Sequence, residues 1–324
     1  MLLHPHDIRL LLEKGRARGA AAFAGLLRGG TSRTEAVWDQ VDAYPRQWTA
    51  VPLIQERLRI TITGSPARNI PAYIQERYGS PEGRWHALSP ACGTGRKELA
   101  WVAAGGIALL EGYDLSHKRI AEADRLAASA GMTSSTRFSA CDVRTLDLPP
   151  ASFDLVILDD ALHHIAPLGP FLEKIRTWLK PDGILVVNEY VGPTRFQWTD
   201  RQIELANRLL DRMPARLKVR PDGTPRPPVY RPGTLAMLMY DPSEAVDSAS
   251  ILPLMREHFT VVEEKKCGGA LLHLVFKDIA HHFLHPDQEA LAVLNRCIAT
   301  EQEEMRAGSI GSDFAFIVAR PPVR

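Results

Sequence analysis

The stretch Leu88-Ser89-Pro90-Ala91-Cys92-Gly93-Thr94-Gly95 decides how the rest of this chain is organised. It predicts a short strand that runs into a tight glycine turn, followed by a helix that begins near Arg96. A glycine turn lets the backbone approach a ligand closely, because no Cβ atom stands in the way. Asp114 follows nineteen residues after Gly95, at the end of a second apolar run over 107–113. A carboxylate at the tip of the next strand is placed to accept both hydroxyls of a ribose, so the two features predict a nucleoside-containing cofactor.

The glycine turn matches a dinucleotide fingerprint only in part. In G-x-G-x-x-G the third glycine allows close packing of the helix on the strand, and here Glu98 stands at that position. This disfavours a nicotinamide-dependent oxidoreductase, which we keep as an alternative. A non-catalytic nucleoside-binding module is a second alternative.

Three further motifs follow the turn in a fixed order. Cys141-Asp142-Val143 stands at the end of an expected third strand, and 153–160 predicts a fourth strand that leads into Ala161-Leu-His-His-Ile165. Residues 178–189 predict a helix end, a Pro-Asp-Gly turn and a fifth strand. The whole series, over about 80–192, resembles the class I S-adenosylmethionine-dependent methyltransferases. The chain differs from that family at Ser89, where an acid is common, and at Ala91, where glycine is usual; we expect Ala91 to keep ordinary backbone angles.

The resemblance implies an α/β, Rossmann-like fold of seven strands, a parallel sheet with an antiparallel last strand. Strands that alternate with helices also predict βαβ units and a parallel sheet. We expect this core over 81–192 and 256–324. Residues 259–265 and 313–319 are its last two strands, a final hairpin with helical stretches between them from about Leu271 and Pro286.

Two helical additions flank the expected core. Residues 1–80 predict an N-terminal cap, with helices over 51–62 and 70–78. Residues 193–255 predict an insert that covers the acceptor, in which Thr199-x-x-Gln202 caps one helix and Asp241 begins another. The aromatic residues of the cap either pack the helices on the core or form a lid.

The resemblance also implies which residues hold S-adenosylmethionine. Asp114 is expected to take the ribose hydroxyls and Asp142 the adenine amine, while Gly93 and Gly95 let the backbone approach the methionine part. The full expected set is Ala91, Cys92, Gly93, Gly95, Asp114, Leu115, Asp142, Val143 and Asp159.

Methyl transfer needs the acceptor aligned, water excluded and in some cases a proton removed. Ligands of open parallel sheets sit outside the carboxyl ends of the strands, which makes Glu189, His164 and His163 the candidate catalytic residues. A histidine titrates near neutrality, and a partly buried carboxylate at a pocket rim can act as a base of raised pKa. The alternatives are that the histidines are satisfied packing residues and that Glu189 pairs with an arginine of the insert.

Tyr190, Arg195 and Trp198 are the expected acceptor-binding residues. Arg195 comes soon after the fifth strand, and a guanidinium fork there suits a carboxylate or phosphate. Between 195 and 231 nine Lys or Arg stand against four acids. We therefore expect methyl transfer to a small-molecule acceptor in the biosynthesis of bacterial secondary metabolites or glycans. Whether that acceptor is anionic is left open.

The composition of the chain limits which kinds of binding partner we expect. A net charge of +1 gives no reason to expect nucleic acid, and no apolar run reaches the length of a membrane span. Four cysteines without a CxxC pair indicate reduced thiols, and with no signal peptide predicted we expect a cytoplasmic protein, with a homodimer left open. His281, His282, His285 and Glu289 have a spacing that suits a metal, but Pro286 interrupts the helix and we expect no metal site.

Overall fold

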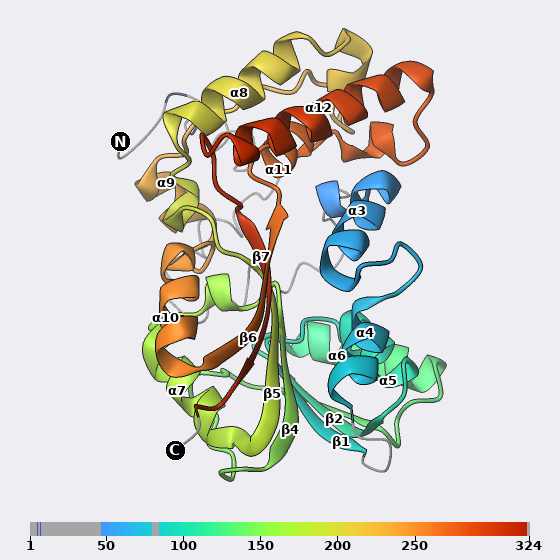
Figure 1. The fold of residues 1–324 in the computed structure, drawn as a ribbon, viewed down its shortest axis with the longest axis vertical. Helices are drawn as coiled ribbons and strands as arrows, with labels where there is room; N and C mark the ends of the chain where they lie inside the picture. Colours follow the sequence, from blue (N-terminus) through green and yellow to red (C-terminus); the bar gives the residue numbers. More distant parts are fainter. Residues whose placement is uncertain (1–4, 6, 8–46, 80–83, 323–324) are drawn as a thin grey trace.

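A computed structural model describes residues 5, 7, 47–79 and 84–322. It is built around one seven-stranded sheet in the order β3-β2-β1-β4-β5-β7-β6. Strands β1 to β5 pair in parallel, and β7 runs antiparallel to both of its neighbours, β5 and β6 (Figure 1). This confirms the predicted fold. The strands are β1 (Trp85–Pro90), β2 (Ile107–Asp114), β3 (Thr136–Ala140), β4 (Phe153–Asp159), β5 (Leu179–Tyr190), β6 (Thr260–Gly268) and β7 (Phe314–Arg320).

Helices connect the strands and form the additions. They are α3 (Pro52–Thr63), α4 (Ile70–Tyr78), α5 (Arg96–Ala103), α6 (His117–Ser129), α7 (Leu168–Trp178), α8 (Asp200–Asp211), α9 (Thr234–Tyr240), α10 (Ile251–His258), α11 (Leu272–Phe276) and α12 (Gln288–Arg306). The helices predicted over 51–62 and 70–78 are α3 and α4. The predicted capping box is present at α8, where Thr199 and Gln202 exchange hydrogen bonds.

Both faces of the sheet are covered, which explains why its central strands are apolar throughout. In β4, Leu155 and Ile157 belong to the core that α4, α5 and α6 complete, whereas Val156 and Leu158 belong to the core beneath α7 and α10. Successive strand residues point to opposite faces, so a strand buried on both faces needs an uninterrupted apolar run.

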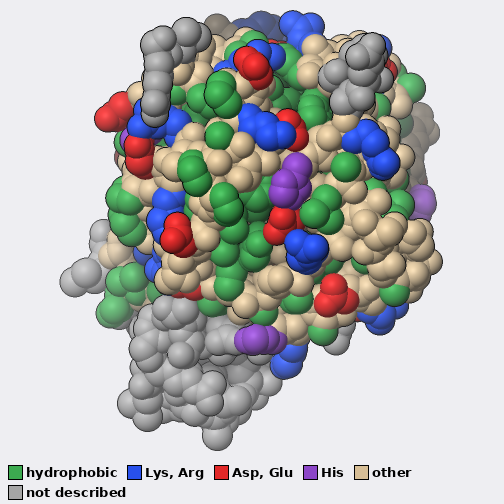
Figure 2. Space-filling view, turned by 90° about the horizontal axis from the view of Figure 1, so that it is seen from below, with side chains coloured by type: hydrophobic (Ala, Val, Ile, Leu, Met, Phe, Trp, Pro, Cys, Tyr) green, Lys and Arg blue, Asp and Glu red, His purple; other side chains and the backbone are tan. Residues whose placement is uncertain are grey.

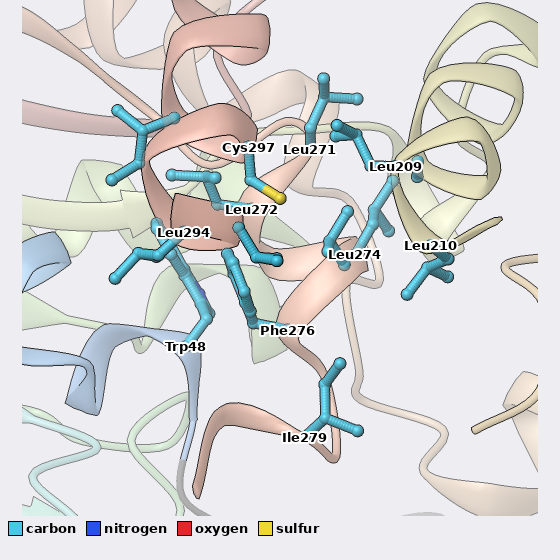
Figure 3. Close-up of a cluster of buried hydrophobic side chains, with 14 of the residues drawn as sticks. Trp48, Leu209, Leu210, Leu271, Leu272, Leu274, Phe276, Ile279, Leu294 and Cys297 are labelled. Carbon is cyan, nitrogen blue, oxygen red and sulfur yellow. The ribbon is translucent and has the colours of Figure 1, made fainter. Parts of the chain in front are cut away.

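A third cluster of buried side chains, here called the cap core, lies away from the sheet. It joins three segments that are far apart in sequence: residues 48–54, residues 198–229 of the insert, and residues 270–310 between β6 and β7. Trp48, Leu209, Phe276 and Leu294 meet there (Figure 3). In Figure 1 helices α8, α11 and α12 lie together beyond the end of the sheet. The helices between β6 and β7 thus pack with the insert.

The predicted helix that begins at Asp241 is wrong. Helix α9 ends one residue earlier, at Tyr240, and 241–247 form turns. The Asp241 carboxylate accepts hydrogen bonds from the backbone N–H (2.8 Å) and the hydroxyl (2.6 Å) of Ser243. Such a local bond offers the backbone an alternative to a helix, and Ala245 follows with a φ of 46°.

The described residues include no helix that is long and apolar enough to cross a membrane. On the face seen from below in Figure 1, cationic and anionic side chains are interspersed (Figure 2). Most of the predicted N-terminal cap, namely 1–4, 6 and 8–46, lies outside the described residues.

Candidate active site

The glycine turn joins β1 to α5 through three residues of positive φ. Ala91 has a φ of 58°, Gly93 of 58° and Gly95 of 67°. The expectation that Ala91 keeps ordinary backbone angles is therefore wrong. A left-handed conformation costs an alanine about 1–2 kcal/mol because its Cβ approaches the following carbonyl. The turn keeps this shape although one of its positions bears a side chain that disfavours it.

The two glycines of the turn have different surroundings. A Cβ on Gly95 would lie 2.9 Å from both the Ala123 and Phe138 side chains, so Gly95 lets α5 begin against α6 and β3. A Cβ on Gly93 would meet only Arg119 Nη1, at 3.3 Å. Gly95 is therefore also needed for packing, and the expected roles of both glycines toward the methionine part of the cofactor stay predictions.

Asp114 is tied to the glycine turn. Its Oδ2 accepts from the Gly93 N–H at 2.9 Å, and its Oδ1 accepts from the Ser116 N–H at 2.9 Å. An ionised carboxylate has about four lone-pair sites, so each oxygen keeps capacity for a further donor. The side chain is nearly buried at the end of β2, with Leu115 directly after it. This arrangement fits a carboxylate that is held rigidly for ribose hydroxyls.

The next two candidates of the cofactor set follow β3. Arg144 donates hydrogen bonds to the Asp142 carboxylate from Nε (2.9 Å) and Nη2 (2.6 Å), and these bonds lower the pKa of Asp142. Val143 is buried beside it. An adenine amine at Asp142 would share the carboxylate with this guanidinium, so the role of Asp142 stays a prediction.

A lysine that sequence reasoning missed connects the glycine turn to the end of β4. Lys97 Nζ lies 2.6 Å from Asp159 Oδ1 and 2.7 Å from Asp160 Oδ2, and Asn188 Nδ2 donates to Asp159 Oδ1 at 3.0 Å. Its position in the first turn of α5, directly after the glycine turn, is the signal that could have identified it. The predicted cofactor residue Asp159 thus shares one cation from α5 with Asp160.

Glu189 is not the side chain at a pocket rim that we expected. It is completely buried, and Oε2 accepts from the N–H groups of Ala161 (2.8 Å) and Leu162 (2.6 Å). Its Oε1 accepts from the N–H of Tyr190 at 2.7 Å and bonds His163 Nδ1. With both oxygens engaged, Glu189 acts by fixing the loop after β4 and orienting His163, and its partner is this histidine and not an arginine of the insert.

His163 and His164 lie with ring centroids 3.9 Å apart at the carboxyl-terminal edge of the sheet. Burial opposes the charged form of His163, but the carboxylate of Glu189 outweighs it and raises the pKa of His163 to about 9. Burial and the neighbouring His163 lower the pKa of His164. At neutral pH the pair therefore combines an imidazolium with a neutral imidazole.

Glu244, in the insert, is a further residue of this group that sequence reasoning missed. Its Oε1 lies 3.7 Å from His163 Nε2, and Ser243 Oγ lies 3.4 Å from His164 Nδ1. The N–H of Val246 donates to the carbonyl of His163 at 2.9 Å and holds the insert against the loop. Ligand atoms of His163, His164 and Glu244 lie within 4.8 Å of one another, a set that could hold a metal ion.

Of the predicted acceptor-binding residues, Arg195 lies beside this group. It has a φ of 55°, its N–H donates to the Ala245 carbonyl (2.7 Å), and Nη1 donates to the Glu244 carbonyl (3.0 Å). Tyr190 and Trp198 are both buried. The Tyr190 hydroxyl donates to the Pro193 carbonyl at 3.2 Å. The two rings pack in one aromatic group with Phe196, His273 and Phe314.

The histidines considered as metal ligands near α12 have other contacts. His282 Nε2 lies 2.8 Å from the Val219 carbonyl, and Glu289 pairs with Arg216 at 2.7 Å. These two residues thus have other partners, and the expectation that this cluster holds no metal stays a prediction.

Comparison with known proteins agrees with this geometry. Residues 88–187 match the family model of the methyltransferase domain. The phosphoethanolamine N-methyltransferase of Plasmodium falciparum (isolate 3D7) is 32% identical over 65 residues, 19% of this chain and 24% of that protein. The 27-O-demethylrifamycin SV methyltransferase of Amycolatopsis mediterranei (strain S699) is 26% identical over 104 residues, 32% of this chain and 38% of that protein. The chain thus spans less than half the length of these curated relatives.

A solved structure shares the fold over most of this chain. It is the phosphoethanolamine N-methyltransferase 2 of Haemonchus contortus in complex with S-adenosyl-L-methionine, with a TM-score of 0.51 and 15% identity, covering 90% of this chain and 60% of that one. The strand order and the glycine turn belong to the same fold. Residues 88–187 therefore match a methyltransferase domain, and the chain shares the fold of that solved methyltransferase.

Proposed function

We propose that this chain transfers the methyl group of S-adenosylmethionine to a small-molecule acceptor at the His163–His164 pair. The observation that carries the proposal is the common position of two features. The glycine turn with Asp114 and the two histidines follow β1, β2 and β4, so all of them lie at the carboxyl-terminal edge of one parallel sheet. Open α/β sheets bind their ligands at that edge.

The residues present fit S-adenosylmethionine. Gly93 leaves its surroundings open where a backbone must approach a ligand, and Asp114 is preorganised by two backbone N–H groups. The cofactor supplies a methyl group on a sulfonium, which is an excellent leaving group. The chain must therefore hold the acceptor in line, keep water out and receive any proton that the acceptor releases.

On the side of the site where the methyl acceptor would bind, neutral His164 can accept a proton and lies beside the cationic His163. In the proposed step the acceptor's lone pair forms the new bond to the methyl carbon, the carbon–sulfur bond breaks, and neutral His164 takes the acceptor's proton. Imidazolium His163, oriented by Glu189, donates from Nε2. Arg195 carries five N–H donors in a fork suited to a carboxylate or phosphate, so we include acceptors with an anionic group.

We further propose that the insert roofs the acceptor, together with the N-terminal segment. The support is twofold. The insert is fastened to the histidine loop by the hydrogen bond from the Val246 N–H to the His163 carbonyl and by the Glu244 carboxylate beside His163 Nε2. It is also fastened to residues 48–54 through the cap core. A roof of this kind excludes water from the reacting atoms.

The experiment has two stages. Thermal shifts with S-adenosylhomocysteine, NAD and NADP test the cofactor: stabilisation by S-adenosylhomocysteine alone is expected, and stabilisation by a nicotinamide dinucleotide alone would favour the oxidoreductase. Methyl-labelled S-adenosylmethionine is then incubated with paired acceptors that differ only in an anionic group, beginning with amines and hydroxyl compounds. Label transfer is expected; binding without transfer to any acceptor class would favour the non-catalytic module.

A further inference from the structure

Three side chains that could bind a metal ion meet beside the proposed reaction: His163, His164 and Glu244. Their ligand atoms lie within 4.8 Å of one another, and the described part of the chain holds no other group of three histidine, cysteine or acidic side chains that meets so closely. Two atoms that bind the same Zn²⁺ ion at about 2.0–2.2 Å lie about 3–4.2 Å apart. His163 Nε2 and Glu244 Oε1, 3.7 Å apart, already have such a spacing. The group therefore needs only a small movement to surround one ion.

His163 is oriented as histidines that bind metals usually are. Its Nδ1 bonds the buried carboxylate of Glu189, so that Nε2 is the nitrogen that faces Glu244. A histidine that binds a metal almost always bonds a carboxylate, a carbonyl or a water through its second nitrogen, which fixes the ring and makes it a stronger ligand. Glu189 is held in turn by three backbone N–H groups. The ring of His163 is thus fixed before any ion arrives.

The third ligand comes from the insert, whose backbone is fixed at this point. The Val246 N–H donates to the His163 carbonyl at 2.9 Å, and Arg195 Nη1 donates to the Glu244 carbonyl at 3.0 Å. These bonds hold the main chain of Glu244 beside the histidines. Its side chain is 26% exposed, so an ion can reach the group from solvent on this side.

A second pair of adjacent histidines shows that two neighbouring rings are not sufficient. The ring centroids of His281 and His282 lie 4.0 Å apart, against 3.9 Å for His163 and His164. His282 Nε2, however, lies 2.8 Å from the Val219 carbonyl. A carbonyl only accepts, so this nitrogen carries a proton and offers no lone pair to a metal. Within the described residues this pair belongs to no group of three ligands, and it serves as the matched control.

We propose that His163, His164 and Glu244 bind one Zn²⁺ ion, and that this ion inhibits methyl transfer. Two imidazoles and one carboxylate are a ligand set typical of zinc, and they leave a fourth position open. The inhibition rests on the proposed function, in which His164 accepts a proton and His163 donates from Nε2. A neutral imidazole has one lone pair, so a metal-bound His164 cannot accept that proton. Zn²⁺ at Nε2 likewise replaces the proton that His163 would donate. The metal-free site is then the active one.

Titration calorimetry with Zn²⁺, on protein freed of metal by a chelator, tests the site without an acceptor. The wild-type protein is expected to bind one ion with a Kd of about 1 µM, weaker than closed four-ligand sites reach. Glu244→Gln should bind the ion at least about 100-fold more weakly, because it loses a ligand, whereas loss of an outer partner costs about 10–100-fold. Glu244→His supplies another ligand and should bind within about tenfold of wild type. His282→Asn should leave the affinity unchanged.

NMR signals of the histidine side chains show whether the ion lies at this group. Addition of Zn²⁺ should shift the signals of His163 and His164 and leave that of His282 in place. This readout uses the wild-type protein, so it decides the question even where a Glu244 variant fails to fold. An unchanged Zn²⁺ affinity in Glu244→Gln, or a bound ion that shifts neither the His163 nor the His164 signal, would overturn the site.

The inhibition is tested with an acceptor found by label transfer. Zn²⁺ should stop the transfer and a chelator should restore it. Glu244→Gln should need more Zn²⁺ for half-inhibition, by the same factor by which its affinity falls. Full turnover with the ion bound would overturn the inhibition. Metal-free protein that binds S-adenosylhomocysteine but transfers no methyl group would instead refute the proposed function, and the Zn²⁺ affinities would still decide the site.

Discussion

Replacing Glu189 by glutamine tests whether this buried carboxylate works through His163. The carboxylate accepts four hydrogen bonds, two at each oxygen. A glutamine amide has only one oxygen. If that oxygen faces the N–H groups of Ala161 and Leu162, the amide NH₂ faces His163 Nδ1 and the N–H of Tyr190. His163 must then accept at Nδ1 and carry its proton on Nε2, as a neutral ring.

The size of the effect follows from the pKa of His163. The value of about 9, against 6.5 for an unperturbed histidine, corresponds to about 3 kcal/mol in favour of the imidazolium. Because the folded-state pKa lies above the unfolded one, this stabilisation is complete below pH 6.5 and is lost as the pH rises to about 9. Without the Glu189 carboxylate, burial lowers the pKa of His163 and only the carboxylates of Glu244 and Asp160 oppose it. The variant also leaves the Tyr190 N–H unpaired, at about 1–3 kcal/mol.

The assay is an NMR titration of the histidine side chains, with His163→Asn to assign the signal. In Glu189→Gln the midpoint of His163 should fall by more than two pH units, and the loss of unfolding free energy between pH 6.5 and 9 seen in wild type should disappear. Once an acceptor is known, turnover should fall about 10²–10⁴-fold. Glu301→Gln disturbs a similar buried carboxylate and should change none of these. A His163 midpoint that stays near 9 in Glu189→Gln would refute the reasoning.

Three other predictions concern the cofactor side and the cap. Asp114→Ala should weaken S-adenosylhomocysteine by about 1.5–3 kcal/mol for each lost charged bond, and unchanged affinity in calorimetry would contradict its role. Gly95→Ala should lower the unfolding free energy by about 2–4 kcal/mol, since its Cβ lies 2.9 Å from Ala123 and Phe138, whereas Gly93→Ala should affect binding more than stability. Burial raises the pKa of Asp313 to about 7, so the wild-type protein loses stability as the pH rises from about 4 to 7. Asp313→Asn should lack this loss. Melting temperatures that change equally with pH in both proteins over that range would disprove the prediction.

The strands of the sheet could be predicted from the sequence because each one has a local pattern of apolar residues. A strand buried on both faces must be apolar throughout, as in β4, and helix α8 carries its own start signal in Thr199 and Gln202. The failures have a different physical origin. Ala91 adopts a positive φ because the turn as a whole demands it, although alanine itself disfavours that angle. At Asp241 a carboxylate bonded to its own neighbours replaced a helix.

The site was harder to predict because it depends on contacts between distant residues. Position alone placed Glu189 and the two histidines at the same edge of the sheet. It did not show that the carboxylate points inward to His163, which converts a candidate base into a positioning residue. Glu244 was missed because it lies about 80 residues after His163 and reaches it only through the folded insert.

The place of β7 has a consequence for how this chain is made. Of the strands in the described residues, β7 comes last in sequence but lies between β5 and β6, and α12, just before it, completes the cap core. Until β7 has left the ribosome, β6 therefore has no strand to pair with, and until α12 has done so the cap core lacks the side chains that α12 contributes. The cofactor half, β1 to β4, can form early in synthesis, whereas the acceptor half is completed in one late step. Shortening the chain by one strand would thus cost the recognition of the acceptor before that of the cofactor.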